Sequence, residues 1–295
     1  MARCSARALD DVLTSPSPWD HPGGLPGRRV GFGERWQGYG RWVSDPEPQH
    51  DMANVFDQAS CWRAEIIAEF RLRGAERCAA ASPTPGFPQL LDSVVFAFGD
   101  VPSGPWLDVG GGLGGTASWI ERTKHRRVVV VDASFAAVSA ARQLFPELDV
   151  GCADAAGLPI RDGSVPAAIV SGVISLLVDV DGLFAELRRV LAGGGRVAMT
   201  DLWSATSSTQ RIGANTFWSL EDVARRAEAH GLQVRHLAVS DLGCGWWSSS
   251  SAQVNDEIVE RHSQHPQYGT WREDLEHLDR VVAARQVVPA AMVLG

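Results

Sequence analysis

Cysteine is scarce in this sequence, and the few cysteines present are not spaced for a disulfide framework or a metal site. The chain of 295 residues has five, at positions 4, 61, 78, 152 and 244, with no CxxC pair among them. Histidine patterns of the HExxH or HxxxD kind are missing as well, so we expect no bound metal. A chain with reduced thiols and a cytoplasmic location is the simplest interpretation.

Long apolar runs and clusters of positive charge are also absent. No stretch approaches the roughly 18 apolar residues that a membrane helix needs, and the first 26 residues lack the apolar core of a secretory signal. The net charge is -8, whereas a nucleic-acid partner calls for clustered Lys and Arg. The sequence therefore predicts no membrane partner and no nucleic-acid partner. A small molecule remains as the expected substrate, and homo-oligomer formation is left open.

Tyrosine is rare where tryptophan is abundant, with two Tyr against eleven Trp. Ordinary core packing is one interpretation of the tryptophans. The other is that some of them line a pocket for a flat or cationic ligand.

The N-terminal part of the chain divides into two segments. Residues 1 to about 50 are rich in Gly, Pro and aromatic residues without a regular period, and we expect them to be flexible. Residues 52–80 have the spacing of three and four that is typical of a helix, and a Pro- and Gly-rich break follows at 82–86. We therefore predict that residues 1–88 form a flexible segment and a helical cap.

From Trp106 onward, strand and helix patterns alternate. Strands are predicted at residues 106–109, 127–131, 149–150, 167–171, 196–200, 233–239 and 287–294. Helices are predicted from about residue 114, after the N-caps Ser134 and Ser219, and over residues 181–191 and 271–285. Repeated strand–helix units imply an α/β fold with a mostly parallel sheet, here of seven strands, and helices on both faces.

A glycine-rich turn, LDVGGGLGG at 107–115, separates the first of these strands from its helix. Glycines let the backbone turn sharply and let a ligand approach closely, and the helix behind them offers free N–H groups. Gly110, Gly112 and Gly115 fit the dinucleotide pattern GxGxxG. Gly110, Gly112 and Gly114 fit the pattern GxGxG instead, so the turn alone leaves both interpretations open.

Three acids at successive strand ends favour the second interpretation. Asp108 directly precedes the glycines, where a carboxylate repels a pyrophosphate but pairs with the α-ammonium of a methionine moiety. Asp132 ends the next strand and can accept hydrogen bonds from ribose hydroxyls, which both interpretations predict. Asp154 follows the third strand and can accept a hydrogen bond from the amine of adenine.

With these residues in place, the sequence resembles the class I S-adenosylmethionine-dependent methyltransferases of the ubiquinone and menaquinone type. The matching segments are LDVGGGLGG, VVVVDAS, CADAAGLPIRDGSV, AAIVSGVISLL and ELRRVLAGGGRVAMTD, which lie between residues 107 and 201. Ser175 stands where many relatives have His, so a base of the family type is missing there. The resemblance implies S-adenosylmethionine as cofactor. The implied binding residues are Asp108, Gly110 and Gly112 at the methionine end, Asp132 and Ala133 at the ribose and adenine, Asp154 and Ala155 at the adenine, and Ser171 beside the sulfonium.

The resemblance also implies a Rossmann-like fold whose last strand is antiparallel and lies beside the fifth. Residues 89–295 would form the S-adenosylmethionine-binding domain, with a lid insertion at about 242–285. Two alternatives stay open, an NAD(P)-dependent oxidoreductase and a non-catalytic cofactor-binding protein of the same fold.

The methyl acceptor is expected to be a small, aromatic or hydrophobic specialised metabolite that offers a carbon, nitrogen or oxygen nucleophile. His50 and Tyr39 are the candidate catalytic residues, because a carbon or phenol nucleophile benefits from a general base. The aromatic stretch at 36–42 and the insertion are expected to meet as a lid that excludes water. The candidate substrate-binding residues are Trp36, Asp201, Trp203, Trp246 and Trp247.

Overall fold

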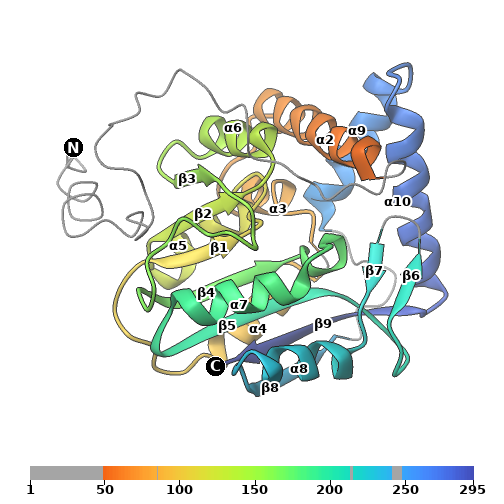
Figure 1. Ribbon diagram of the computed structural model, residues 1–295. Coiled ribbons are helices and arrows are strands. Elements are labelled where there is room, and N and C mark those ends of the chain that lie inside the picture. The colour runs from red at the N-terminus through yellow and green to blue at the C-terminus, as the bar shows by residue number, and fades with distance from the viewer. Residues whose placement is uncertain (1–48, 85, 213–214, 241–247) are drawn as a thin grey trace, which may run out of the picture.

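The computed structural model describes residues 49–84, 86–212, 215–240 and 248–295, with side chains from residue 53 onward (Figure 1). Its centre is a seven-stranded sheet in the order β3-β2-β1-β4-β5-β9-β8. The strands are β1 (Trp106–Val109), β2 (Val128–Asp132), β3 (Asp149–Cys152), β4 (Val165–Ser171), β5 (Leu191–Ser204), β8 (Val234–Val239) and β9 (Val287–Leu294). Strands β1 to β5 pair in parallel, and β9 runs antiparallel between β5 and β8. The predicted fold class is confirmed.

Each face of the sheet buries its own set of apolar side chains. In β2, Val128 and Val130 belong to one core cluster, whereas Val129 and Val131 belong to the other, as the alternation of a strand requires. Helices α4 (Gln89–Phe96), α5 (Gly115–Lys124) and α6 (Phe135–Leu144) cover the first face. Helices α7 (Val180–Val190) and α8 (Leu220–Ala229) cover the second (Figure 1).

The N-terminal helical pattern forms two helices, α2 (Gln49–Glu69) and α3 (Gly74–Ala80), and not the single helix predicted over 52–80. The break lies where Arg71 adopts a left-handed conformation with φ 51°. The Leu72 N–H then donates to the Ile67 carbonyl at 3.3 Å, which closes the helix end. The apolar periodicity of the sequence continues through Arg71, so the periodicity does not reveal that α2 ends there.

The structure adds elements that were not predicted. A short hairpin, β6 (Gln210–Ile212) and β7 (Asn215–Phe217), follows β5, and a 3-10 turn, η1 (Ile174–Leu176), follows β4. Helix α9 (Ser249–His262) precedes the predicted last helix, α10 (Tyr268–Ala283). Few apolar residues mark α9, since only Val254 and Ile258 are buried apolar side chains in it.

Helices α2, α9 and α10 lie side by side at one end of the molecule (Figure 1). The ring of Trp62 in α2 stacks on His262 at 4.8 Å between centroids and meets the edge of Trp271 at 6.2 Å. The buried Arg63 donates to the Ala80 carbonyl at 3.1 Å and to Oδ1 of Asn255. These contacts join the N-terminal helices to the segment before β9.

Candidate cofactor site

The glycine-rich loop lies at the carboxyl ends of the parallel strands. It is held to β2, because the Gly110 N–H donates to the Val131 carbonyl at 2.7 Å. Gly110 has φ 70°, and a Cβ there would lie 2.4 Å from Cγ2 of Val173. Gly112 has φ 54°, with no heavy atom within 4 Å of where its Cβ would be. Neither position suits a larger residue, and Gly112 leaves open space where a ligand can approach the backbone.

Asp108 is a buried carboxylate whose nearest donor among the described residues, the Ala117 N–H, lowers its pKa without meeting the geometry of a hydrogen bond. Its side chain belongs to β1 and the residue is 1% exposed, and within the described part of the chain neither oxygen accepts a hydrogen bond of normal geometry. Burial, and then the negative charge of Asp132, raises the pKa of this carboxyl to about 7. An unpaired buried carboxyl is costly for a fold, so this one is suited to a cationic ligand that supplies the missing hydrogen bonds.

Asp132 connects the end of β2 to the loop. Its Oδ2 accepts from the Gly112 N–H and its Oδ1 from the Ser134 N–H, both at 2.8 Å. Each oxygen keeps a second lone pair, which is the capacity needed to accept from two ribose hydroxyls. Burial raises the pKa of this carboxyl, and the nearby carboxylate of Asp57 raises it as well.

Asp57 is a residue that the sequence analysis missed. It lies in α2 and accepts a hydrogen bond from the hydroxyl of Ser134, the N-cap of α6. This contact spans 77 residues of sequence, and no local motif marks it. It brings the N-terminal helix to the edge where Asp132 lies.

The third predicted acid, Asp154, is exposed beyond β3. Its Oδ1 accepts from the Ala156 N–H at 2.8 Å, so the carboxylate stabilises its own turn. Ala155 next to it is half-buried, and Ala133 at the end of β2 is exposed. The three residues follow neighbouring strands, as predicted, and their contact with adenine stays a prediction.

Ser171 is the last residue of β4, and Asp201 lies within the neighbouring strand β5. The hydroxyl of Ser171 is 2.7 Å from that of Thr200, and both residues are buried. The carboxylate of Asp201 accepts from the Ser175 hydroxyl at 3.1 Å and from the Leu202 N–H at 2.7 Å. Burial raises the pKa of Asp201 to about 6 despite these bonds. Asp201 thus fastens η1 to β5, which favours its structural interpretation over contact with a substrate.

The tryptophans within the described residues pack in the core or against it. Trp203 is fully buried, and its indole N–H donates to the Ala290 carbonyl at 2.8 Å, so we do not carry it forward as a substrate contact. His50 lies in the first turn of α2, but its side chain is outside the described part. Tyr39, Trp36, Trp246 and Trp247 lie outside the described residues, as does the whole aromatic stretch 36–42. Of the predicted lid insertion at 242–285, residues 248–285 are described and contain α9 and α10. Whether the two segments meet as a lid stays a prediction.

These residues fit S-adenosylmethionine. Asp108 lies beneath the loop at Gly111, where its negative charge attracts a cation, and its contact with the α-ammonium group stays a prediction. The backbone at Gly112 is open to a ligand. Asp132 offers free lone pairs for the ribose hydroxyls on the neighbouring strand. A dinucleotide would place its pyrophosphate on the same loop, next to the buried acid Asp108, where like charges repel.

The comparisons with known proteins agree with this arrangement. Residues 107–199 match the model of a family described as methyltransferase domain. Over 212 residues, the chain is 31% identical to the malonyl-[acyl-carrier protein] O-methyltransferase of Geobacter sulfurreducens, covering 70% of this chain and 78% of that protein. Among solved structures, the [4+2]-cyclase SpnF has a TM-score of 0.63 at 19% identity, over 84% of this chain and 97% of that one. A methyltransferase from Thiobacillus denitrificans in complex with S-adenosyl-L-homocysteine has a TM-score of 0.55 at 18% identity, over 75% of this chain and 96% of that one.

The seven-stranded sheet, with the glycine-rich loop at its carboxyl edge, has the architecture of a class I methyltransferase. The chain belongs to the S-adenosylmethionine-dependent methyltransferase family. It is an enzyme that uses S-adenosylmethionine, and the oxidoreductase and non-catalytic alternatives are set aside.

The described residues lack two kinds of feature. No helix among them is both long and apolar enough to cross a membrane. No group of His, Cys, Asp and Glu side chains among them is arranged to hold a metal ion.

Proposed function

We propose that the enzyme methylates a small hydrophobic or aromatic molecule of specialised metabolism. The observation that carries the proposal is the apolar surface beside the cofactor loop. Leu176 in η1 and Val178 just after it are 37% and 60% exposed, and they follow the carboxyl end of β4. An apolar acceptor that covers these side chains gains about 25 cal/mol for each Å² of apolar surface removed from water.

The residues at this edge would position an acceptor. S-adenosylmethionine, when bound, supplies a methyl group on a positively charged sulfur, and the acceptor's lone pair displaces the neutral thioether. Asp108 and Asp132 would hold the two ends of the cofactor, and η1, fastened by Asp201, would present Leu176 to the acceptor. Positioning of the nucleophile and exclusion of water are the main contributions expected from a protein in such a displacement.

The curated relative supports a different acceptor. Its name states O-methylation of a malonyl group carried by an acyl-carrier protein. Because the two chains are 31% identical, a malonyl group on a carrier protein is the second candidate for the methyl acceptor of this enzyme.

A transfer assay with labelled S-adenosylmethionine separates the two. The acceptors would be phenols, aromatic amines, apolar carboxylic acids and malonyl-loaded carrier protein. We expect transfer to a small apolar acceptor, and we expect Leu176→Glu to raise its KM about 10-fold or more, because a charge replaces apolar contact. The Kd of the cofactor should be unchanged. Val239→Glu, at a site 59% exposed on the edge strand β8, is the matched control. Transfer to malonyl carrier protein alone would overturn the proposal.

A further inference from the structure

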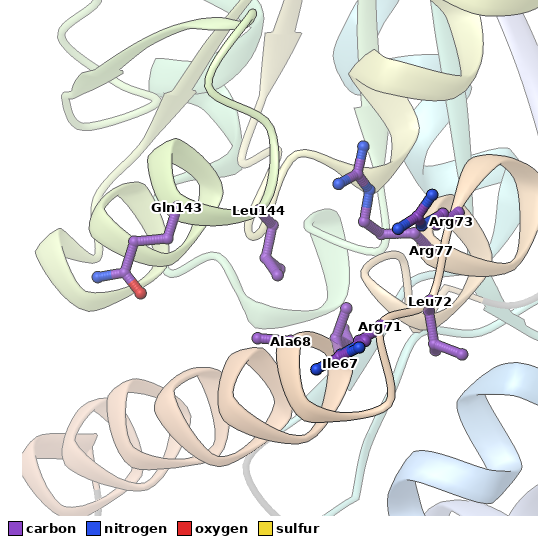
Figure 2. Close-up of a pocket in the computed structure, with 8 residues that line it drawn as sticks. All are labelled: Ile67, Ala68, Arg71, Leu72, Arg73, Arg77, Gln143 and Leu144. Atoms are coloured by element: carbon purple, nitrogen blue, oxygen red, sulfur yellow. The ribbon is translucent and has the colours of Figure 1, made fainter.

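A pocket distinct from the cofactor site lies between α2, α3 and α6, and Figure 2 shows the side chains that line it. Its volume is about 260 Å³. The lining residues are Ile67, Ala68, Arg71, Leu72, Arg73, Arg77, Gln143 and Leu144. Three of them are arginines, in a chain whose net charge is -8.

The pocket lies at the far end of α6 from the cofactor. Helix α6 begins after its N-cap Ser134, beside Asp132, and ends ten residues later at Leu144, in the pocket wall. At 1.5 Å per residue, the two sites are about 15 Å apart. Neither the cofactor nor an acceptor at the carboxyl edge therefore explains this pocket.

The arginines of the pocket have no acidic partner. Within the described residues, Arg71, Arg73 and Arg77 form no ion pair, and the nearby Glu69 is paired with Arg261 instead. Arg71 and Arg73 are exposed and Arg77 is half-buried, so these three unpaired positive charges at one pocket are suited to an anion.

Arg77 is held in place and still lacks a partner. Its guanidinium lies 4.7 Å from the centre of the Phe145 ring, which fixes the side chain against the core. Its Nε is buried and donates no hydrogen bond to the described residues. Because this nitrogen is buried even with the pocket empty, an anion in the pocket would meet the terminal nitrogens of the guanidinium and not Nε.

Arg71 occupies a position where glycine is favoured. It is the left-handed residue that ends α2, with φ 51°, and an L-residue there costs about 1 kcal/mol relative to glycine. The side chain at this costly position lines the pocket, which is consistent with a role for the charge.

We propose that this pocket binds a small organic phosphate. Guanidinium forks match the geometry of phosphate oxygens, and a phosphate monoester carries close to two negative charges at neutral pH. The apolar side chains of Ile67, Leu72 and Leu144 offer a surface for a short apolar group attached to the phosphate. The volume exceeds the roughly 30 Å³ share of one water several-fold, so it accommodates more than a bare ion.

The test uses the full chain and phenyl phosphate as the probe, with inorganic phosphate and phenol for comparison, followed by calorimetric titration. We expect saturable binding of phenyl phosphate that is about 5-fold or more tighter than that of inorganic phosphate, because the ring covers apolar surface. Arg77→Gln should weaken it about 10-fold or more, through loss of a charge-assisted hydrogen bond. Arg235→Gln, on the opposite edge strand β8, should leave it unchanged.

Arg71→Gly separates binding from folding. Glycine suits the left-handed conformation, so the melting temperature should stay the same or rise while phenyl phosphate binding weakens. The affinity of these variants for S-adenosylmethionine should not change. The phosphate-binding result can therefore be judged separately from the proposed methyl-transfer function. The proposal fails if phenyl phosphate does not bind, or if it binds Arg77→Gln and Arg71→Gly as tightly as it binds the wild type. It fails equally if vesicles containing phosphatidic acid bind through these arginines and the free phosphate does not.

Discussion

Two buried charged residues of this enzyme differ in how the fold treats them. Arg63, 6% exposed, donates to the Ala80 carbonyl and to Asn255. Asp108, 1% exposed, has no hydrogen-bond partner of normal geometry among the described residues. Burial lowers the pKa of Arg63 to about 10, which leaves it charged at neutral pH, whereas it raises the pKa of Asp108 to about 7. A satisfied buried charge serves the structure, and an unsatisfied one indicates where a ligand binds.

If Arg63 is structural, its removal should produce the largest loss of stability. Arg63→Leu leaves the Ala80 carbonyl and the Asn255 amide oxygen buried without donors, at about 1 to 3 kcal/mol each. We expect the free energy of unfolding to fall by about 3 to 5 kcal/mol, measured by chemical denaturation.

The control for that loss is Arg272→Leu. Arg272 forms an exposed ion pair with Glu276 on α10, and such pairs contribute about 0 to 1 kcal/mol. If Arg63→Leu and Arg272→Leu both lowered the free energy of unfolding by a similar, small amount, Arg63 would not be a structural charge. S-adenosylmethionine affinity of Arg63→Leu, measured below its melting temperature, should be near the wild-type value.

The opposite pattern is expected for Asp108→Asn, which should bind the cofactor about 10- to 100-fold more weakly and yet be more stable without it. Its carboxyl has a pKa of about 7 in the folded protein, above the unfolded value, so folding is favoured by the protonated form. The wild type therefore loses stability as pH rises from about 4 through about 7. Asn does not titrate, so the variant should gain about 2 to 4 kcal/mol over the wild type at pH about 8 and little at pH about 4.

Thermal unfolding of the two proteins across this pH range measures the difference directly. Effects of the titratable groups that do not interact with Asp108 are common to both proteins and cancel, and only the titration of Asp132 changes with it. A variant that is less stable than the wild type at high pH would show that Asp108 has a structural partner, and would sink its assignment as the ammonium site.

The last of the three effects is expected at Asp132, where the fold already supplies two hydrogen bonds. Asp132→Ala should weaken S-adenosylmethionine binding by about 1.5 to 3 kcal/mol, through loss of charged hydrogen bonds to the ribose. Isothermal titration gives this value. Asp179→Ala is the control, because that carboxylate only caps α7 by accepting from the Gly182 N–H. Equal losses of affinity in both variants would argue against a ribose contact at Asp132.

The sheet and the cofactor edge could be predicted from the sequence because their signals are local. Strand β9 was predicted at its observed bounds, and the loop glycines and the acids Asp108 and Asp132 adjoin strands that alternation reveals. The strand ends carry the site, so finding the strands also found these acids.

The way in which helices α2, α9 and α10 pack together could not be predicted, because their contacts join residues far apart in the sequence. Arg63 and Asn255 are separated by 192 positions, and Asp57 and Ser134 by 77. Arg71 ended α2 without glycine, and α9 had too few apolar residues to show a period. Trp203, chosen for a pocket, lies in the core, since a tryptophan pattern does not distinguish the two.

The place of β9 between β5 and β8 sets an order for folding. Strands β1 to β5 pair with partners from residues 106–204, so this part of the sheet can assemble from nearby segments. Among the described strands, β8 pairs with β9 alone, which comes about 50 residues later in the chain. Strand β8 therefore joins this sheet when β9 has docked on β5. The edge with β8, and the helices between β8 and β9, should therefore be the last part to gain protection from hydrogen exchange.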